Sequence, residues 1–225
     1  MKNKNRMTFI FCNVLFLITL TGCGGNGDSK NAKESKIANK AVSTFSLNPG
    51  EYIADTDSSS VFWECGWIGG YSHNGDVSLE QGLLSVNYEK GLTGSFLVDM
   101  TTIDCFDEKN LGTKNKIIGH LMSDDFFDVE NHQKASLVIT SSENIGGNMF
   151  SFEGNLTIKN ITNSVQMKGE VQKTDLGYSA VIDLIFDRSK YDVKYRSASF
   201  FSDLGDRTIS DDVSLNVKVK MNKKT

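Results

Sequence analysis

The stretch that decides the fold runs Phe150-Ser-Phe-Glu-Gly-Asn-Leu-Thr-Ile-Lys159, and its apolar and polar side chains alternate. A β-strand points successive side chains to opposite faces, so this pattern predicts a strand with one face in a core and one in solvent. Three later rows repeat the alternation, with the apolar members Val165, Met167 and Val171; Tyr178, Ala180, Ile182, Leu184 and Phe186; and Val213, Leu215, Val217, Val219 and Met221. Each row is typical of an antiparallel strand with one dry face.

The first half of the chain carries the same signal less regularly. We expect further strands over residues 52–54, 60–67, 75–80, 83–89, 94–103 and 136–143, and one short helix over residues 107–120. So many strands with one dry face predict a single sheet that closes on itself or folds over. The prediction is therefore an all-β fold with one short helix. If the sheet closes, it forms an antiparallel, eight-stranded β-barrel whose interior holds packed side chains or one small ligand.

The first residues have the order of a bacterial lipoprotein signal. Lys2, Lys4 and Arg6 precede a hydrophobic run over residues 9–20, which is too short to span a membrane but suits a signal peptide. Leu20-Thr-Gly-Cys23 then resembles a lipobox, in which cleavage precedes a cysteine that becomes lipidated. The alternative is a short buried helix that ends at a glycine turn. We predict a signal peptide over residues 1–22, a flexible tether with lipidated Cys23 over residues 23–48, and a folded barrel over residues 49–225.

Composition and charge exclude several classes of protein. Of the 225 residues, 39% are hydrophobic, 23% are charged and one is proline, which is globular composition rather than that of collagen, a disordered tail or a polytopic membrane protein. Loss of the three cations of the signal peptide changes the formal charge from −4 to −7, which argues against a nucleic-acid binder. Four cysteines are too few for a disulfide scaffold.

Small residues fall on the dry faces of three successive strand rows, at Gly154, Gly169 and Ala180. If the hairpin around Asn160 pairs residues whose numbers sum to about 321–323, the two glycines lie opposite or diagonal to each other. If the turn over residues 175–177 is tight, Ala180 comes next in that row. One interpretation is a band of tiny side chains that leaves space inside the barrel. The other is that the glycines permit the bends that a barrel needs. The residues alone leave both interpretations open.

Several segments together resemble the YceI-like family, lipocalin-like barrels associated with binding polyisoprenoid lipids. In order they are Tyr52-Ile-Ala-Asp-Thr-Asp-Ser-Ser-Ser-Val-Phe-Trp63, Ser72-His-Asn-Gly75, Phe96-Leu-Val-Asp-Met100 leading to Ile103-Asp104, His120-Leu-Met-Ser-Asp-Asp-Phe-Phe-Asp-Val129, Gly154-Asn-Leu-Thr-Ile-Lys159, Asp187-Arg-Ser-Lys-Tyr191 through Ser199-Phe-Phe-Ser-Asp-Leu-Gly-Asp206, and Ile209-Ser-Asp-Asp212. The resemblance covers nearly the whole folded part and implies an extended antiparallel barrel with an elongated apolar tunnel and no enzymatic reaction. This chain departs from the family pattern at Asn160, where glycine is usual, and at Cys65 and Cys105.

The ligand-binding prediction combines an apolar wall with a headgroup contact. Burial of a long apolar chain is worth about 0.8 kcal/mol per CH₂. The predicted wall residues are Phe150, Phe152, Gly154, Leu156, Met167, Gly169, Ile182, Leu184, Leu215 and Val217. The densest basic stretch, residues 188–196, contains Tyr195 and Arg196, which we expect to contact an anionic headgroup such as an isoprenoid phosphate. The alternative is a solvated loop paired with the aspartates at positions 187, 192 and 203.

The remaining cysteines and the histidines are the residues that bear on covalent and metal chemistry. Cys65 and Cys105 either form a disulfide after export, worth about 4 kcal/mol on the chain-entropy model, or stay as two buried thiols. The histidines His73, His120 and His132 have no local metal-ligand spacing, so neither a metal site nor a cofactor is predicted. Hydrogen bonds that anchor turns explain His73 and His120 about as well as any function does.

The sequence thus predicts a binding module and not an enzyme: a membrane-anchored, lipid-binding protein that holds a long-chain isoprenoid or similar amphiphile inside its barrel. We expect it to be exported and attached through Cys23, at the periplasmic face of the outer membrane. The expected partners are an isoprenoid-type lipid and the membrane. One alternative is a structural or stress-related envelope protein with a filled core. Another is a hydrolase or redox enzyme on the same barrel, which would need a polar cluster inside.

Overall fold

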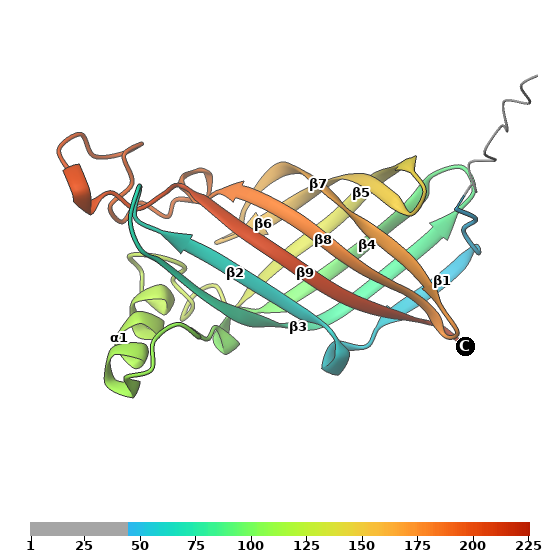
Figure 1. The fold of residues 1–225 in the computed structure, drawn as a ribbon, viewed down its shortest axis with the longest axis horizontal. Coiled ribbons are helices and arrows are strands. Elements are labelled where there is room, and N and C mark those ends of the chain that lie inside the picture. Colours follow the sequence, from blue (N-terminus) through green and yellow to red (C-terminus); the bar gives the residue numbers. More distant parts are fainter. Residues whose placement is uncertain (1–44) are drawn as a thin grey trace, which may run out of the picture. The chain divides into compact units, whose positions relative to one another are not determined.

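A computed structural model describes residues 45–225 of the chain. The predicted signal peptide, Cys23 and most of the predicted tether lie outside the described residues. The described part contains one antiparallel sheet of nine strands, shown in Figure 1: β1 Gly50–Ala54, β2 Ser60–Gly66, β3 Ser72–Asn87, β4 Gly91–Asp99, β5 Lys134–Gly146, β6 Met149–Ile158, β7 Ile161–Thr174, β8 Gly177–Asp187 and β9 Asp212–Lys223.

The nine strands make an eight-position closed barrel because β1 and β2 share one position. The sheet runs from β3 through β2, β9, β8, β7, β6 and β5 to β4, and β3 pairs with β4 to close it. Both β1 and β2 pair with β3 on one side and with β9 on the other, and the 3₁₀ turn Thr56–Ser58 separates them. The predicted all-β, eight-stranded antiparallel barrel with one short helix is confirmed.

The structure moves several predicted element boundaries. The strands expected over 75–80 and 83–89 are one strand, β3, whose pairing with β4 is bulged between Leu79 and Gln81. A bulge bends a strand without ending it, so residues 81–82, between the two expected strands, do not form a turn. The strand expected to reach residue 103 ends at Asp99, whose side chain accepts a hydrogen bond from Thr101 N and starts the 3₁₀ turn Met100–Thr102.

The predicted helix is α1, Leu111–Met122, displaced by a few residues from the expected range. Asn110 is its N-cap and accepts a hydrogen bond from Thr113 N at 3.0 Å. Among residues 45–225, no helix has the length and apolar character needed to cross a membrane. α1 lies beside one end of the barrel, together with the β2–β3 turn and the segment over residues 188–211; we call this the helix end (Figure 1). The opposite end, with the C-terminus, β1 and the β7–β8 turn, is the hairpin end.

The β6–β7 turn sets a register that differs from the expected one. Lys159 and Asn160 both have positive φ, 50° and 61°, and Ile158 pairs directly with Ile161, as in a two-residue type I′ hairpin. Gly154 consequently pairs with Val165, and Gly169 with Phe150. The prediction that the two glycines lie opposite or diagonal to each other is wrong. Ala180 does lie diagonal to Gly169, because Gly169 pairs with Ile182.

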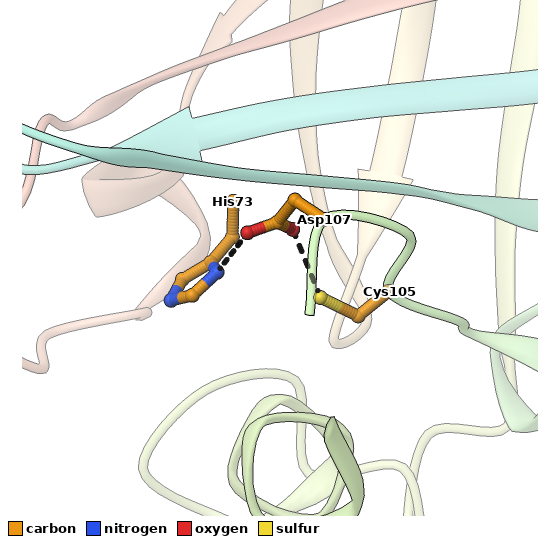
Figure 2. A group of neighbouring side chains, drawn as sticks. All are labelled: His73, Cys105 and Asp107. Carbon is orange, nitrogen blue, oxygen red and sulfur yellow. Dashed lines mark hydrogen bonds and ion pairs between the residues drawn. The ribbon is translucent and has the colours of Figure 1, made fainter. Parts of the chain in front are cut away.

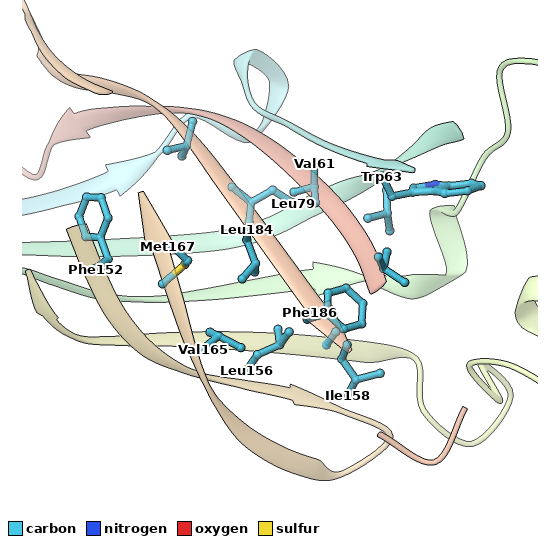
Figure 3. Close-up of a cluster of buried hydrophobic side chains, with 14 of the residues drawn as sticks. Val61, Trp63, Leu79, Phe152, Leu156, Ile158, Val165, Met167, Leu184 and Phe186 are labelled. Atoms are coloured by element: carbon cyan, nitrogen blue, oxygen red, sulfur yellow. The ribbon is translucent and has the colours of Figure 1, made fainter. Parts of the chain in front are cut away.

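The barrel interior is the hydrophobic core, and the alternating rows of the sequence supply it. Most of the predicted inward residues of β6–β9 are buried, including Phe152, Met167 and Leu184, each less than 5% exposed. Figure 3 shows these side chains pointing into the interior from β2, β3, β6, β7 and β8. The exposed residues between them face solvent, as the period of two requires.

Residues 45–48, expected to end the tether, pack against the hairpin end. The Phe45 ring meets Phe150 edge to face, with centroids 5.6 Å apart. Asn48 donates its backbone N–H to the Tyr178 hydroxyl at 2.6 Å and accepts from the Tyr52 hydroxyl at 2.9 Å. The folded part therefore includes these residues, and they cap the hairpin end of the barrel.

Candidate functional site

The hairpin-end half of the barrel encloses a cavity of about 120 Å³. We call it the hairpin-end cavity. Its wall is almost wholly apolar, and the side chains that line it come from β2 to β9, among them Leu84, Phe96, Ala180 and Met221. Ser136 and Tyr178 are the two lining residues that carry a hydroxyl group.

A second apolar cavity of about 100 Å³, the helix-end cavity, lies under α1. Leu121 of α1 lines it together with Trp63, Phe126, Phe186 and others. Five residues line both cavities: Val61, Val98, Ala135, Leu156 and Leu215. The two cavities are therefore neighbours along the barrel, separated only by side chains that both share. A chain-shaped apolar ligand fits this arrangement better than a compact polar one.

Most of the predicted wall residues lie where a ligand wall was expected. The predicted residues that line the hairpin-end cavity are Phe152, Leu156, Met167, Ile182, Leu184, Leu215 and Val217. Phe150 is buried but does not line it, because its ring packs on Phe45 and Phe152. Their contact with a ligand stays a prediction.

Gly154 and Gly169 face inward but line neither cavity. A Cβ on Gly154 would come within 2.7 Å of the Val138 carbonyl oxygen, and one on Gly169 within 2.2 Å of the Val181 carbonyl oxygen. Both atoms belong to the backbone of a neighbouring strand. These glycines therefore permit the close strand approach of a strongly curved wall, which favours the bend interpretation over the cavity interpretation. Ala180 is the small residue that lines the cavity.

Arg188, the first residue of the densest basic stretch in the sequence, is a buried cation at the helix-end cavity. Its side chain is 1% exposed, and its nitrogens donate to three backbone carbonyls, those of Ser210, Val193 and Ile209, at 2.8, 3.1 and 3.2 Å. A carboxylate oxygen of Asp211 lies 3.4 Å away. Burial lowers the pKa of Arg188, an effect that Cys65 and Asp211 oppose. The guanidinium thus holds together the backbone around Val193 and that of residues 209–210. The local sequence around Arg188 gives no sign of this role, because residues 209–210 lie about twenty positions away.

Tyr195 and Arg196, the predicted headgroup residues, lie in a surface cleft of about 450 Å³ at the helix end. The other residues that line this cleft are Asp124, Asp125, Lys159, Asp192, Lys194, Phe201 and Leu204. The Arg196 guanidinium lies over the Tyr195 ring, 5.2 Å from its centroid, and forms no ion pair within residues 45–225. Tyr195 also packs on Phe126, with ring centroids 5.5 Å apart, and Phe126 lines the helix-end cavity. Tyr195 of the charged cleft and Phe126 of the cavity wall are therefore neighbours.

Cys65 and Cys105 are free thiols in the structure, Cys65 partly buried and Cys105 buried; a disulfide between them after export stays a prediction. Cys65 is directed toward the Ser210 carbonyl oxygen at 3.6 Å, and burial raises the pKa of its thiol. Cys105 is fully buried and donates instead to an Asp107 carboxylate oxygen at 3.1 Å. The two thiols are engaged by different segments and are not directed at each other.

Each of the three histidines lies beside an aspartate. His120 Nε2 lies 3.3 Å from Asp125, and His132 Nε2 lies 3.6 Å from Asp128. His73 Nδ1 lies 3.0 Å from Asp107, which also contacts Cys105. Sequence reasoning missed the meeting of His73, Cys105 and Asp107, because about thirty residues separate the first from the other two.

Comparisons with known proteins give a family from a family model and a fold from solved structures. A family model described as a YceI-like domain matches residues 52–221. Among solved structures, BcnA of Burkholderia cenocepacia is 18% identical with a TM-score of 0.59, and the match covers 74% of this chain and 98% of that one. A polyisoprenoid binding domain from Saccharophagus degradans, described as implicated in plant cell wall breakdown, is 9% identical with a TM-score of 0.55, covering 79% of this chain and 100% of that one. The comparison with curated proteins found no match. The two structures share the fold of this chain.

Proposed function

The chain belongs to the YceI-like family, and on that premise we propose that its barrel binds a long-chain isoprenoid or a similar amphiphile in the interior. The observation that carries the proposal is the pair of adjoining apolar cavities, which lie end to end within one closed barrel. An unfilled apolar space stays dry and favours apolar occupants. The Saccharophagus domain of the same fold, which is described as polyisoprenoid binding, supports this choice of ligand class.

The cavity volumes bear on the length of the apolar chain. At roughly 10–15 Å³ of such space for each water-sized group, the two cavities together hold on the order of 15–20 groups. We infer that an isoprenoid of a few units fits with little rearrangement. A longer chain requires the caps at the ends, α1 or residues 45–48, to move aside.

The headgroup belongs, in this proposal, at the charged cleft. Arg196 has no ion-pair partner within the described residues, whereas Lys194 pairs with Asp192 at 2.6 Å. A phosphate would form hydrogen bonds with the Arg196 guanidinium, since the two parallel N–H groups of an arginine match the spacing of phosphate oxygens. The ring of Tyr195 packs on Phe126, which lines the helix-end cavity, so a lipid with its headgroup in the cleft would pass these two rings.

Export and membrane attachment are part of the same proposal and rest on the sequence alone. A signal peptide over residues 1–22 and a lipidated Cys23 would place the barrel on a tether at the periplasmic face of the outer membrane. Attachment there would keep the cavity close to membrane lipids. Mass spectrometry of the membrane-extracted protein tests it: a diacylated Cys23 at the N-terminus is expected, and an intact, unlipidated N-terminus would contradict it.

The binding proposal is tested by native mass spectrometry of the purified protein, followed by lipid extraction. We expect a fraction of molecules to carry one apolar ligand of isoprenoid type, released by organic solvent. A barrel that stays ligand-free after exposure to isoprenoid phosphates would support the structural alternative instead. Turnover of the added lipid would favour the enzyme alternative.

Replacing Arg196 with alanine tests the headgroup position. Loss of a charge-assisted hydrogen bond to phosphate is expected to weaken binding of an isoprenoid phosphate by about tenfold. Binding of the matching isoprenoid alcohol should not change, since it lacks the phosphate. Arg207→Ala, in the exposed 3₁₀ turn Gly205–Arg207, is the control. Equal affinity of wild type and R196A for the phosphate would place the headgroup elsewhere.

A further inference from the structure

His73, Cys105 and Asp107 bring three different metal-ligating side chains together at the helix end. Their ligand atoms all lie within 4.8 Å of one another. His73 Nδ1 is 3.0 Å from one Asp107 oxygen, and Cys105 Sγ is 3.1 Å from the other. Figure 2 shows the three side chains converging, His73 from β3 and the other two from the segment that leads to α1. We call them the His-Cys-Asp cluster.

The backbone holds the cluster in place from both sides. Asp104 N donates to the Asp76 carbonyl at 2.9 Å, and Phe106 N donates to the Asn74 carbonyl at 2.8 Å, so residues 104–106 run alongside the start of β3. The contact is close enough that a Cβ on Gly75 would come within 1.8 Å of the Asp104 carbonyl oxygen. Main-chain contacts therefore fix the backbone of the segment that carries Cys105 and Asp107 against β3. A preorganised set of ligands costs less free energy to close around an ion.

Burial and charge also favour a cation. Cys105 is fully buried, and the side chains of Asp107 and His73 are only 14% and 21% exposed. Asp107 accepts from Asn74 N at 3.1 Å and from the Tyr71 hydroxyl. Cys105 and His73 also contact this carboxylate. The cluster therefore places a carboxylate beside an imidazole and a thiol.

We propose that the His-Cys-Asp cluster is a binding site for Zn²⁺ or a cation of similar ligand preference, with solvent at a fourth position. Sulfur, nitrogen and oxygen donors together suit Zn²⁺, which binds them at about 2.0–2.3 Å in a tetrahedron. Ligand atoms in such a tetrahedron are about 3.3–3.6 Å apart. His73 Nδ1 and Cys105 Sγ now lie beside different oxygens of Asp107 and all three ligand atoms are within 4.8 Å of one another, so closure around one ion requires a rotation of the carboxylate and side-chain shifts of about an ångström. Tyr71, which is 55% exposed, places the cluster at the solvent edge.

Binding exchanges protons for the metal ion. Without metal, the Cys105 thiol donates its proton to Asp107. On binding, that proton goes to solvent and Cys105 binds as thiolate, while His73 binds through an unprotonated Nδ1 with its one ring proton on Nε2. The Tyr71 hydroxyl keeps its proton and can still donate to the Asp107 oxygen that does not bind the ion. The bound ion would tie the start of β3 to the segment before α1. The proposal does not depend on lipid binding in the barrel.

The test is titration of the reduced full chain with Zn²⁺ against a chromophoric chelator, and with Co²⁺ followed by absorption. We expect one Zn²⁺ per chain and a thiolate-to-cobalt charge-transfer band. Cys105→Ser and Asp107→Asn should weaken Zn²⁺ binding at least tenfold, and C105S should lose the band. Cys65→Ser is the matched control, since Cys65 is the other core thiol and lies outside the cluster. It should keep both signals.

Three results would overturn the proposal: no Zn²⁺ bound above the level of D107N, a cobalt band that persists in C105S, or a band that is lost in C65S. His73→Gln covers the case in which C105S fails to fold, because His73 is partly exposed and can be replaced with less cost to the core. Wild-type affinity in a folded H73Q protein would equally exclude the site. Thermal melts with and without Zn²⁺ give a second readout, with an upward shift expected in wild type and C65S only.

Discussion

Replacing Arg188 with leucine is expected to lower the free energy of unfolding by about 3–5 kcal/mol. The guanidinium donates to three backbone carbonyls and faces the Asp211 carboxylate from a position that is 1% exposed. Leucine fills part of the volume but leaves those carbonyls and the carboxylate without their partner. Removing one member of a buried charged network costs far more than replacing an exposed arginine.

Urea unfolding followed by tryptophan fluorescence measures this effect, since Trp63 is buried in the barrel. Arg207→Leu is the control, because Arg207 lies in an exposed 3₁₀ turn of the same loop region and should change stability by no more than about 0.5 kcal/mol. A loss of less than about 1 kcal/mol in R188L would mean that the loops at the helix end hold without the guanidinium.

Replacing Ala180 with phenylalanine is expected to abolish ligand uptake while the barrel stays folded. Ala180 lies on β8 and pairs with Val171 on one side and Val219 on the other. All three line the hairpin-end cavity, so the added ring enters the space that the proposed ligand occupies. Because the ring fills existing space, the loss in free energy of unfolding should be smaller than the loss of about 1–3 kcal/mol that overpacking a filled core causes.

Val181→Phe is the matched control for this experiment. Val181 is the next residue along β8, points outward and is 42% exposed, so the same ring there leaves the cavity open. Native mass spectrometry of both variants, after lipid loading in parallel, gives the comparison. A folded A180F protein that retains as much ligand as V181F would show that the hairpin-end cavity is not the binding site.

Much of the fold follows from local pattern in the sequence. The alternation at Phe150, Phe152 and Leu156 directs those side chains inward in any antiparallel sheet, and the structure confirms that they are buried. Most of the predicted cavity wall follows from the same rule, because inward residues of a closed barrel meet in its interior. The resemblance to the YceI-like family is also confirmed.

Register could not be predicted with the same security. The type I′ turn requires positive φ at both Lys159 and Asn160, and lysine rarely adopts that conformation. Asn160 marks the turn but not its length, and the alignment of Gly154 with Gly169 failed because the turn has only two residues. A small change at one turn moves every pairing along two strands.

The amino-acid sequence by itself determined that this chain forms an antiparallel barrel with an apolar interior, because strand periodicity acts over a few residues and needs no distant partner. Only the tertiary structure decided how that interior is used. It turned Gly154 and Gly169 into points of close strand approach and left the open space beside Ala180. It also buried Arg188 among carbonyls and brought His73 to Asp107. Those outcomes depend on contacts between segments far apart in the chain, whose geometry is set only when the whole barrel closes.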